Sequence, residues 1–141
     1  MSQRRLELTD HSCQMAEKWV KELTTDLKWK ESHITLRLLR ATLHALRDWL
    51  QVNEAAQLGA QLPTLIRGLY YEAWKLQMTP VKPRSRDDFL IRIGVEMSPE
   101  VVGNIDIAVS TVFKFLSQRI SAGEIADVRA SLPADLRALW K

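Results

Sequence analysis

The sequence predicts an all-α protein made of two tandem four-helix repeats packed into one compact domain. Apolar residues recur three and four positions apart along most of the chain, and no segment alternates with the period of two that a strand requires. Shifting the sequence by 70 positions also places residues 19–71 on residues 89–141 without a gap. The identical pairs under this shift are Leu46/Leu116, Glu54/Glu124, Ala56/Ala126, Ala60/Ala130, Leu62/Leu132, Pro63/Pro133, Arg67/Arg137 and Leu69/Leu139. Because about 50 residues bury too little surface alone, we expect the copies to pack together about an approximate internal two-fold axis.

The N-terminal repeat occupies residues 1–76 and should begin with two long helices. Thr9 or Ser12 is placed to cap the first of these, and Ser32 to cap the second. The second helix has a continuous apolar stripe at Leu36, Leu39, Leu43, Leu46 and Leu50. Such a stripe is typical of a helix that packs against a core along its whole length.

Two shorter helices should complete this repeat. Asn53 is expected to cap a helix that ends near Gln61. Pro63 is suited to the first turn of the next helix, because its missing N–H would have no partner there, and this helix should reach Trp74.

Residues 77–86 are predicted to be a linker, because Pro80 and Pro83 exclude a continuous helix. The acidic pair Asp87 and Asp88 then suits the positive end of a new helix.

The C-terminal repeat, residues 87–141, should follow the same plan. Ser98 and Pro99 are expected to start its long helix. Ser121 and Glu124 have the spacing of a capping box, in which each side chain bonds the backbone N–H of the other.

Composition indicates a globular chain in a reducing compartment. The 141 residues are 46% apolar and 26% charged, and no apolar run approaches the roughly 20 residues of a membrane span. Cys13 is the only cysteine, which excludes an internal disulfide. We therefore expect a cytoplasmic protein without a membrane segment.

The net charge of +3 is too small for the clustered basic face of a typical nucleic-acid binder, so nucleic-acid binding is the third function hypothesis.

Three segments of the chain resemble one bacterial family. The first reads Leu-Leu-Arg-Ala-Thr-Leu-His-Ala-Leu-Arg-Asp-Trp-Leu from Leu38, the second Ala60-Gln61-Leu62-Pro63, and the third Tyr70-Tyr71-Glu72-Ala73-Trp74. Together with Gly123-Glu124-Ile125-Ala126-Asp127-Val128-Arg129, these are similar to the domain of unknown function 2267, over most of the chain from about Asp10. The resemblance implies a small helical cytoplasmic protein with tandem copies of the domain, and it carries no catalytic residue or cofactor.

No grouping of residues predicts catalysis, a cofactor or a metal site. His11 and Cys13 point about 200° apart on a helix, and zinc needs three or four converging ligands. His44 and Asp48 can interact as an i, i+4 pair, but no nucleophile accompanies them at a usable spacing. We therefore expect a protein that is not an enzyme.

Two arginines and two glutamates keep their places in both repeats. Arg67 and Arg137 each follow the repeated proline by four residues. We expect each arginine to reach a carboxylate or carbonyl of a neighbouring helix, with Glu54 and Glu124 as candidate partners. The alternative is that the arginines contact an anion.

The first function hypothesis is a protein-interaction or self-associating module. Its predicted contact surface is Tyr70, Tyr71 and Trp74, because aromatic residues are enriched among interface anchors. The alternative is a binder of a small apolar or anionic ligand between the repeats. A cavity lined by Trp and Met side chains, with Arg67 or Arg137 at its mouth, would favour it.

Overall fold

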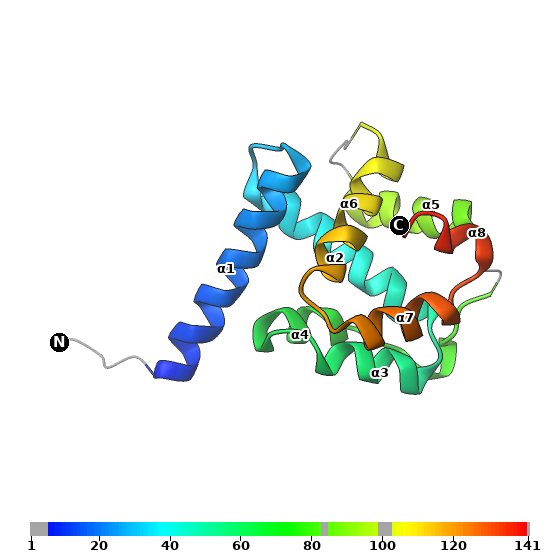
Figure 1. Ribbon diagram of the computed structural model, residues 1–141, viewed down its shortest axis with the longest axis horizontal. Coiled ribbons are helices and arrows are strands. Elements are labelled where there is room, and N and C mark those ends of the chain that lie inside the picture. The colour runs from blue at the N-terminus through cyan, green and yellow to red at the C-terminus, as the bar shows by residue number, and fades with distance from the viewer. Residues whose placement is uncertain (1–5, 83–84, 99–102, 141) are drawn as a thin grey trace.

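The computed structural model describes residues 6–82, 85–98 and 103–140, and within them every regular element is a helix. The elements are α1 (Glu7–Leu27), α2 (Ser32–Trp49), α3 (Val52–Ala60), α4 (Thr64–Tyr71), the short 3-10 helix η1 (Leu76–Met78), α5 (Arg86–Met97), α6 (Ile105–Ser117), α7 (Ala122–Ser131) and α8 (Ala134–Arg137). The predicted all-α class is therefore confirmed. Figure 1 shows the helices gathered around α2, with the amino-terminal end of α1 projecting from the body.

The central helix is α2, which contacts α1, α3, α4, α5 and α6. Eleven of its 18 residues are buried, so it is covered on several sides and not only along the predicted stripe. The stripe is buried from Leu39 onward, whereas Leu36 remains 36% exposed at the edge of the core.

Helices from the two halves of the chain pack directly on one another. We call α1 to η1 the first half and α5 to α8 the second half. Contacts join α1 with α6, α2 with α5, α2 with α6 and α3 with α7. A run of aromatic rings crosses the same seam, with centroid distances of 5.3 Å from Trp49 to Phe89, 6.0 Å from Phe89 to Phe113 and 4.3 Å from Phe113 to Trp140. The two halves therefore share a single core.

The helix boundaries agree with the 70-residue offset seen in the sequence. α1 ends at Leu27 and α5 at Met97, while α3 begins at Val52 and α7 at Ala122. The contact of α1 with α6 also has its counterpart in the contact of α5 with α2. This pattern is the one that an internal two-fold axis produces, and the axis itself stays a prediction that superposition of the halves would test.

The caps predicted for the first half are wrong. The N-cap of α1 is Leu6, so neither Thr9 nor Ser12 caps this helix. The N-caps of α2 and α3 are Glu31 and Gln51, one and two residues before the predicted caps. None of these N-caps makes a side-chain capping bond, so burial of apolar faces positions these helices.

The second half has two serine caps, of which the one at Ser121 was predicted and is confirmed. Ser85 accepts a hydrogen bond from the backbone N–H of Asp88, at 3.1 Å, at the start of α5. Ser121 accepts one from the backbone N–H of Glu124, at 3.2 Å, at the start of α7.

The predicted start of the long helix of the second half is wrong. Ser98 is the C-cap of α5, and α6 begins at Ile105, where the Asn104 side chain accepts from the N–H of Ile107. Pro99 lies outside the described residues.

The linker docks on α2 instead of extending away from it. α4 stops at Tyr71 instead of Trp74, because Ala73 takes the left-handed conformation (φ 59°) and reverses the chain. Trp74 Nε1 then donates to Thr79 Oγ1 at 3.0 Å, and the N–H of Val81 donates to the carbonyl of Asp48 at 2.8 Å.

Candidate functional site

A buried carboxyl group, that of Glu124, meets a half-buried one, that of Glu54, where α3 packs on α7. These two glutamates occupy equivalent places under the 70-residue shift. Oε2 of each is buried, and no N–H or hydroxyl group of any other described residue donates to either atom. Burial, the hydrogen bond to Glu54 and the charges of Glu54 and Asp127 raise the pKa of Glu124 to about 8. Glu124 therefore keeps a proton at neutral pH, beside Glu54.

The sequence analysis missed this pair because it assigned each glutamate a different partner. The Glu124 carboxyl faces Glu54, so the reciprocal bond of the predicted capping box is not what it forms. The repeat was nevertheless a signal. Equivalent residues of two copies that pack about a two-fold axis face each other when they lie near the axis.

Arg67 holds the turn between α3 and α4. Its Nε donates to the carbonyl of Gly59 at 2.9 Å, and its Nη2 donates to the carbonyls of Ala60 and Leu62 at 3.1 and 2.8 Å. The expectation that Arg67 reaches a carbonyl of a neighbouring helix is met, but the pairing with Glu54 is wrong. Arg137 is exposed, and no ion pair joins it to Glu124 in the described part of the chain. 

Two buried side chains of α2, His44 and Arg47, bind the carboxyl end of α4. The imidazole of His44 places Nε2 2.7 Å from the Leu69 carbonyl and Nδ1 3.0 Å from Oε2 of Glu96. Arg47 donates through Nη1 to the Tyr70 carbonyl at 2.8 Å. The Arg47 contact satisfies a carbonyl at the end of α4 and places positive charge at the negative end of the helix dipole.

His44 is therefore a structural residue with both ring nitrogens facing acceptors. The predicted contact with Asp48 is wrong, because Asp48 binds Arg47 at 2.8 Å and Arg92 at 2.5 Å. Burial raises the pKa of Glu96, but the hydrogen bond and charge of His44 and the charge of Arg92 outweigh it and leave that pKa below its usual value. With neither nitrogen open to a substrate, this histidine cannot serve as a general base without breaking the contact.

The predicted aromatic contact surface is wrong for Tyr70. Its side chain is fully buried, and its hydroxyl donates to the Ala55 carbonyl at 2.6 Å. Burial also raises the pKa of this hydroxyl above its usual value. Tyr71 and Trp74 are half-buried, and they pack against the core with ring centroids 5.5 Å apart. 

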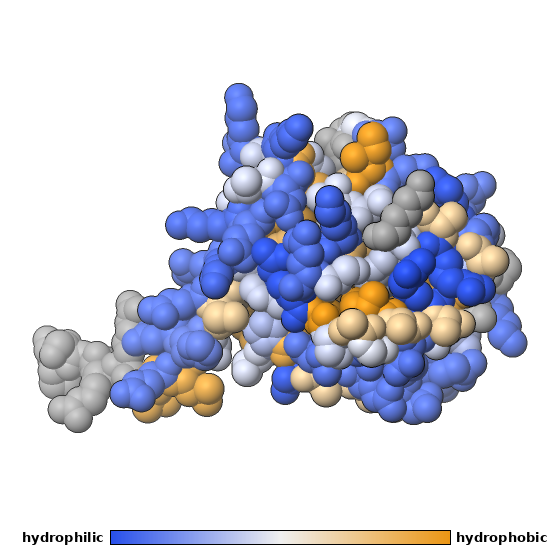
Figure 2. Space-filling view, viewed as in Figure 1, coloured by the Kyte–Doolittle hydropathy of each residue, from blue (hydrophilic) through white to orange (hydrophobic). Residues whose placement is uncertain are grey.

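An apolar groove runs between α1, the start of α2 and α4. It has a volume of about 510 Å³, and we call it the α1–α4 groove. Its lining residues are Cys13, Ala16, Glu17, Val20, Lys21, Ser32, His33, Leu36, Leu65 and Leu69. Leu36 and Leu65 are 36% and 44% exposed in it. The projecting end of α1 carries Leu6 and Leu8, which are more exposed than Leu36 and Leu65. Figure 2 shows apolar side chains, in orange, at this end of the helix.

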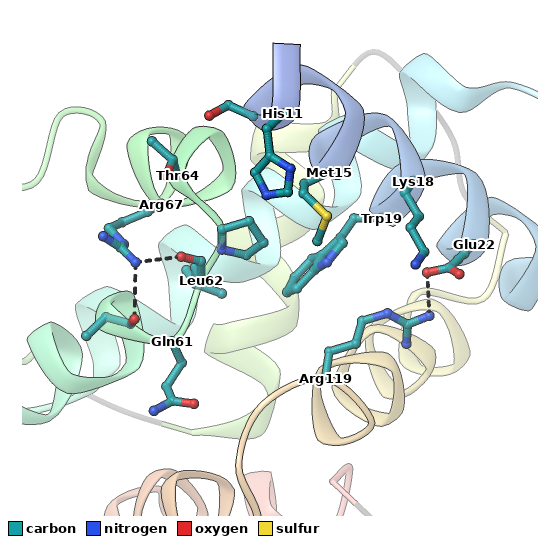
Figure 3. Close-up of a pocket in the computed structure, with 13 residues that line it drawn as sticks. His11, Met15, Lys18, Trp19, Glu22, Gln61, Leu62, Thr64, Arg67 and Arg119 are labelled. Atoms are coloured by element: carbon teal, nitrogen blue, oxygen red, sulfur yellow. Dashed lines mark hydrogen bonds and ion pairs between the residues drawn. The ribbon is translucent and has the colours of Figure 1, made fainter. Parts of the chain in front are cut away.

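The opposite face of α1 borders a second depression, which we call the cationic cleft. It has a volume of about 470 Å³ and lies between α1, the α3–α4 turn and the end of α6 (Figure 3). Its lining residues are His11, Ser12, Met15, Lys18, Trp19, Glu22, Ala60, Gln61, Leu62, Pro63, Thr64, Arg67 and Arg119. Arg119 binds Glu22 at 2.9 Å and stacks on the Phe115 ring, 3.6 Å from its centroid.

Sequence reasoning did not identify Lys18 or Arg119 as members of one cleft. The two residues are about a hundred positions apart, and the repeat carries no counterpart of this cleft because Trp49 occupies the place of Arg119 in the first half. One local signal was present: His11, Met15, Lys18 and Glu22 recur every three or four residues, which places them on one face of α1.

No group of three or more His, Cys, Asp or Glu side chains within the described residues could hold a metal ion. None of the helices in this part of the chain has the length and hydropathy of a membrane span.

The comparisons with known proteins identify the family. A family model described as an uncharacterized conserved protein (DUF2267) matches residues 16–139, from the middle of α1 to the end of the last turn. None of the curated proteins matches this chain. Since the match covers all eight helices at least in part, the chain belongs to the DUF2267 family of uncharacterised conserved proteins.

Proposed function

We propose that the protein is a non-enzymatic module that works by contact, and that it associates with a second copy of itself through the α1–α4 groove. The observation that carries the proposal is the projecting end of α1, where Leu6 is 72% and Leu8 68% exposed. The first buried residue of this helix is Ala16, more than two turns after it begins at Glu7.

A helix end of this kind needs a surface to pack on. Short helical segments are only marginally stable in water without tertiary packing. Burying one leucine side chain contributes about 1.5–3 kcal/mol, so covering Leu6, which is in heptad register with the groove residues Cys13 and Val20, favours association.

A second copy suits the groove because α1 carries both the projecting apolar end that would be buried and residues that line the groove. Leu6, Cys13 and Val20 are seven residues apart, so they follow one face of the chain, and Cys13 and Val20 line the groove. In an antiparallel, two-fold arrangement the Leu6 end of each α1 lies over the groove of the other copy. Glu17 and Lys21 give the groove one charge of each sign, which suits an apolar helix better than an ionic ligand.

The non-enzymatic part of the proposal rests on the contacts of the polar groups. Both ring nitrogens of His44 contact acceptors in the fold, the Leu69 carbonyl and the Glu96 carboxylate. Nε and Nη2 of Arg67 donate to backbone carbonyls of the α3–α4 turn. Arg67 is also the basic residue that a recognition helix at α4 would present to nucleic acid, and its engagement in the turn counts against that third hypothesis.

Size-exclusion chromatography with light scattering tests the self-association. We expect a dimer at concentrations of tens of micromolar, a monomer for Leu36→Glu, and a dimer for the matched control Val95→Glu. Val95 is 71% exposed on α5 and does not line the groove. A wild-type monomer at several hundred micromolar, or equal behaviour of the two variants, would refute the proposal.

A further inference from the structure

We infer that the cationic cleft binds a small, flat organic acid, with its ring against Trp19 and Met15 and its acid group held by Lys18. This site lies on the other side of α1 from the α1–α4 groove, and the inference does not depend on self-association.

The charge of the cleft favours an anion. Lys18, Arg67 and Arg119 line it together with one carboxylate, that of Glu22, so its lining is net positive with His11 neutral. Arg119 neutralises Glu22 through the 2.9 Å ion pair. Among the described residues Lys18 has neither an ion pair nor a hydrogen bond, so its ammonium is available to a ligand.

The two arginines are fixed before any ligand arrives. Three backbone carbonyls hold Arg67, and Glu22 and the Phe115 ring hold Arg119. Their guanidinium groups therefore contribute a fixed positive field, and binding does not have to immobilise them. Figure 3 shows them on opposite sides of Trp19, with Lys18 on the same side as Arg119.

The floor of the cleft is apolar and suits a ring. Met15 and Trp19 lie between the cationic side chains in Figure 3, and the indole of Trp19 packs edge-to-face on the Phe115 ring, with centroids 5.3 Å apart. Trp19 is 5% exposed and Met15 is half-buried, so a small part of the indole and the thioether side chain border the cleft. Aromatic edges carry partial positive charge and favour offset or edge-to-face contact with a ring. An inorganic anion would leave this floor unused.

The size of the cleft suits a small molecule. Its volume of about 470 Å³ lies within the range of roughly 300–1,000 Å³ typical of ligand sites. It is also formed by both halves of the chain, since α1 and the α3–α4 turn come from the first half and Arg119 from the second. A ligand here would therefore contact both halves at once.

The test uses three probes that separate the ring from the charge: 2-naphthoate, the neutral 2-naphthylmethanol and inorganic phosphate. Binding is followed by the indole N–H signals in ¹H–¹⁵N spectra of the wild-type protein, with Trp19 assigned through Trp19→Phe. We expect 2-naphthoate to shift the Trp19 signal, and to bind at least about tenfold more tightly than either other probe, because only it uses both charge and floor.

The matched variants are Lys18→Glu and Lys21→Glu, which make the same charge change one turn apart on α1. Lys18 lines the cationic cleft, whereas Lys21 lines the α1–α4 groove. We expect Lys18→Glu to raise the dissociation constant of 2-naphthoate at least about tenfold, since it replaces attraction by repulsion, and Lys21→Glu to change it less than about twofold. The oligomeric state of both variants is measured first, so that loss of self-association is not taken for loss of ligand binding.

Three outcomes would overturn the inference: no shift of the Trp19 signal with 2-naphthoate, equal affinity for 2-naphthoate and 2-naphthylmethanol, or equal weakening by the two lysine variants. None of these outcomes bears on whether the protein forms a dimer.

Discussion

The proton that Glu124 keeps beside Glu54 should make the stability of this protein fall as the pH rises through neutrality. The folded-state pKa of Glu124, about 8, lies above its ordinary value of 4.5. The folded state therefore binds the proton more tightly than the unfolded chain. This contribution to stability is complete below pH 4.5, decreases as the pH rises, and is lost once the pH passes 8.

The size of the effect follows from the same two values. A pKa difference from 4.5 to about 8 corresponds to a ceiling of about 5 kcal/mol, at about 1.4 kcal/mol per pKa unit. Glu54 is only half-buried, so rearrangement and solvent will reduce this ceiling. We expect the free energy of unfolding to fall by about 2–3 kcal/mol between pH 5 and pH 8.5, a large part of the usual stability of a domain.

Glu124→Gln isolates this contribution. The amide is close in size to a protonated carboxyl and can donate to Glu54 at any pH, so the variant should lose less than about 1 kcal/mol over the same range. Its free energy of unfolding should exceed that of the wild type at pH 8.5. Urea denaturation followed by circular dichroism at 222 nm, repeated from pH 4.5 to pH 9, measures both quantities.

The control is Glu7→Gln, which changes an exposed carboxylate in the first turn of α1. Histidines titrate in the same pH range, so the difference between variant and wild type is the informative quantity. The reasoning is refuted if the wild type is equally stable at pH 5 and pH 8.5, or if Glu124→Gln and Glu7→Gln have the same pH profile.

Two further substitutions test the packing around α4. Glu96→Gln removes the carboxylate that binds His44 and should lower the free energy of unfolding by about 1–3 kcal/mol at pH 7. Because folding lowers the pKa of Glu96, its carboxylate stabilises the protein fully above the ordinary pKa, and this stabilisation is lost as the pH falls through the lowered pKa. The destabilisation by Glu96→Gln should therefore shrink at low pH, which urea denaturation measures. Gly59→Ala should lower the melting temperature although alanine favours helices, because its Cβ would lie 2.4 Å from the Tyr71 hydroxyl oxygen. The matched variant Gly68→Ala, whose Cβ would have no atom within 4 Å, should raise the free energy of unfolding by up to about 1 kcal/mol. The opposite order of the two melting temperatures in differential scanning calorimetry would contradict this packing.

The sequence predicted the helices best where the local pattern alone decides the structure. Ser121 caps its helix as expected, because a capping serine bonds an N–H only three residues ahead. The sequence predicted the structure least well where a segment distant in the chain contacts the helix or linker. Ala73 ends α4 early, and the linker lies against α2 through the bond from Val81 to Asp48.

The candidate sites show the same limit more strongly. The sequence singled out residues that recur in both halves, but it did not predict that Glu54 and Glu124 face each other or that Arg67 binds backbone carbonyls of the α3–α4 turn. Tyr70 looked like a surface anchor by residue type, whereas packing places it in the core with its hydroxyl satisfied by Ala55. Residue type indicates what a side chain can do, but its neighbours determine which of those contacts it makes.

By itself the sequence determined the all-α class, the family and the apolar faces that form the core, because helical periodicity is a local property repeated along the chain. Only the tertiary structure decided that two carboxyl groups share a buried site and that Lys18 joins Arg119 beside Trp19. Such sites form between helices far apart in the sequence, and the pKa and binding properties of their side chains depend on distances and burial that no local pattern encodes.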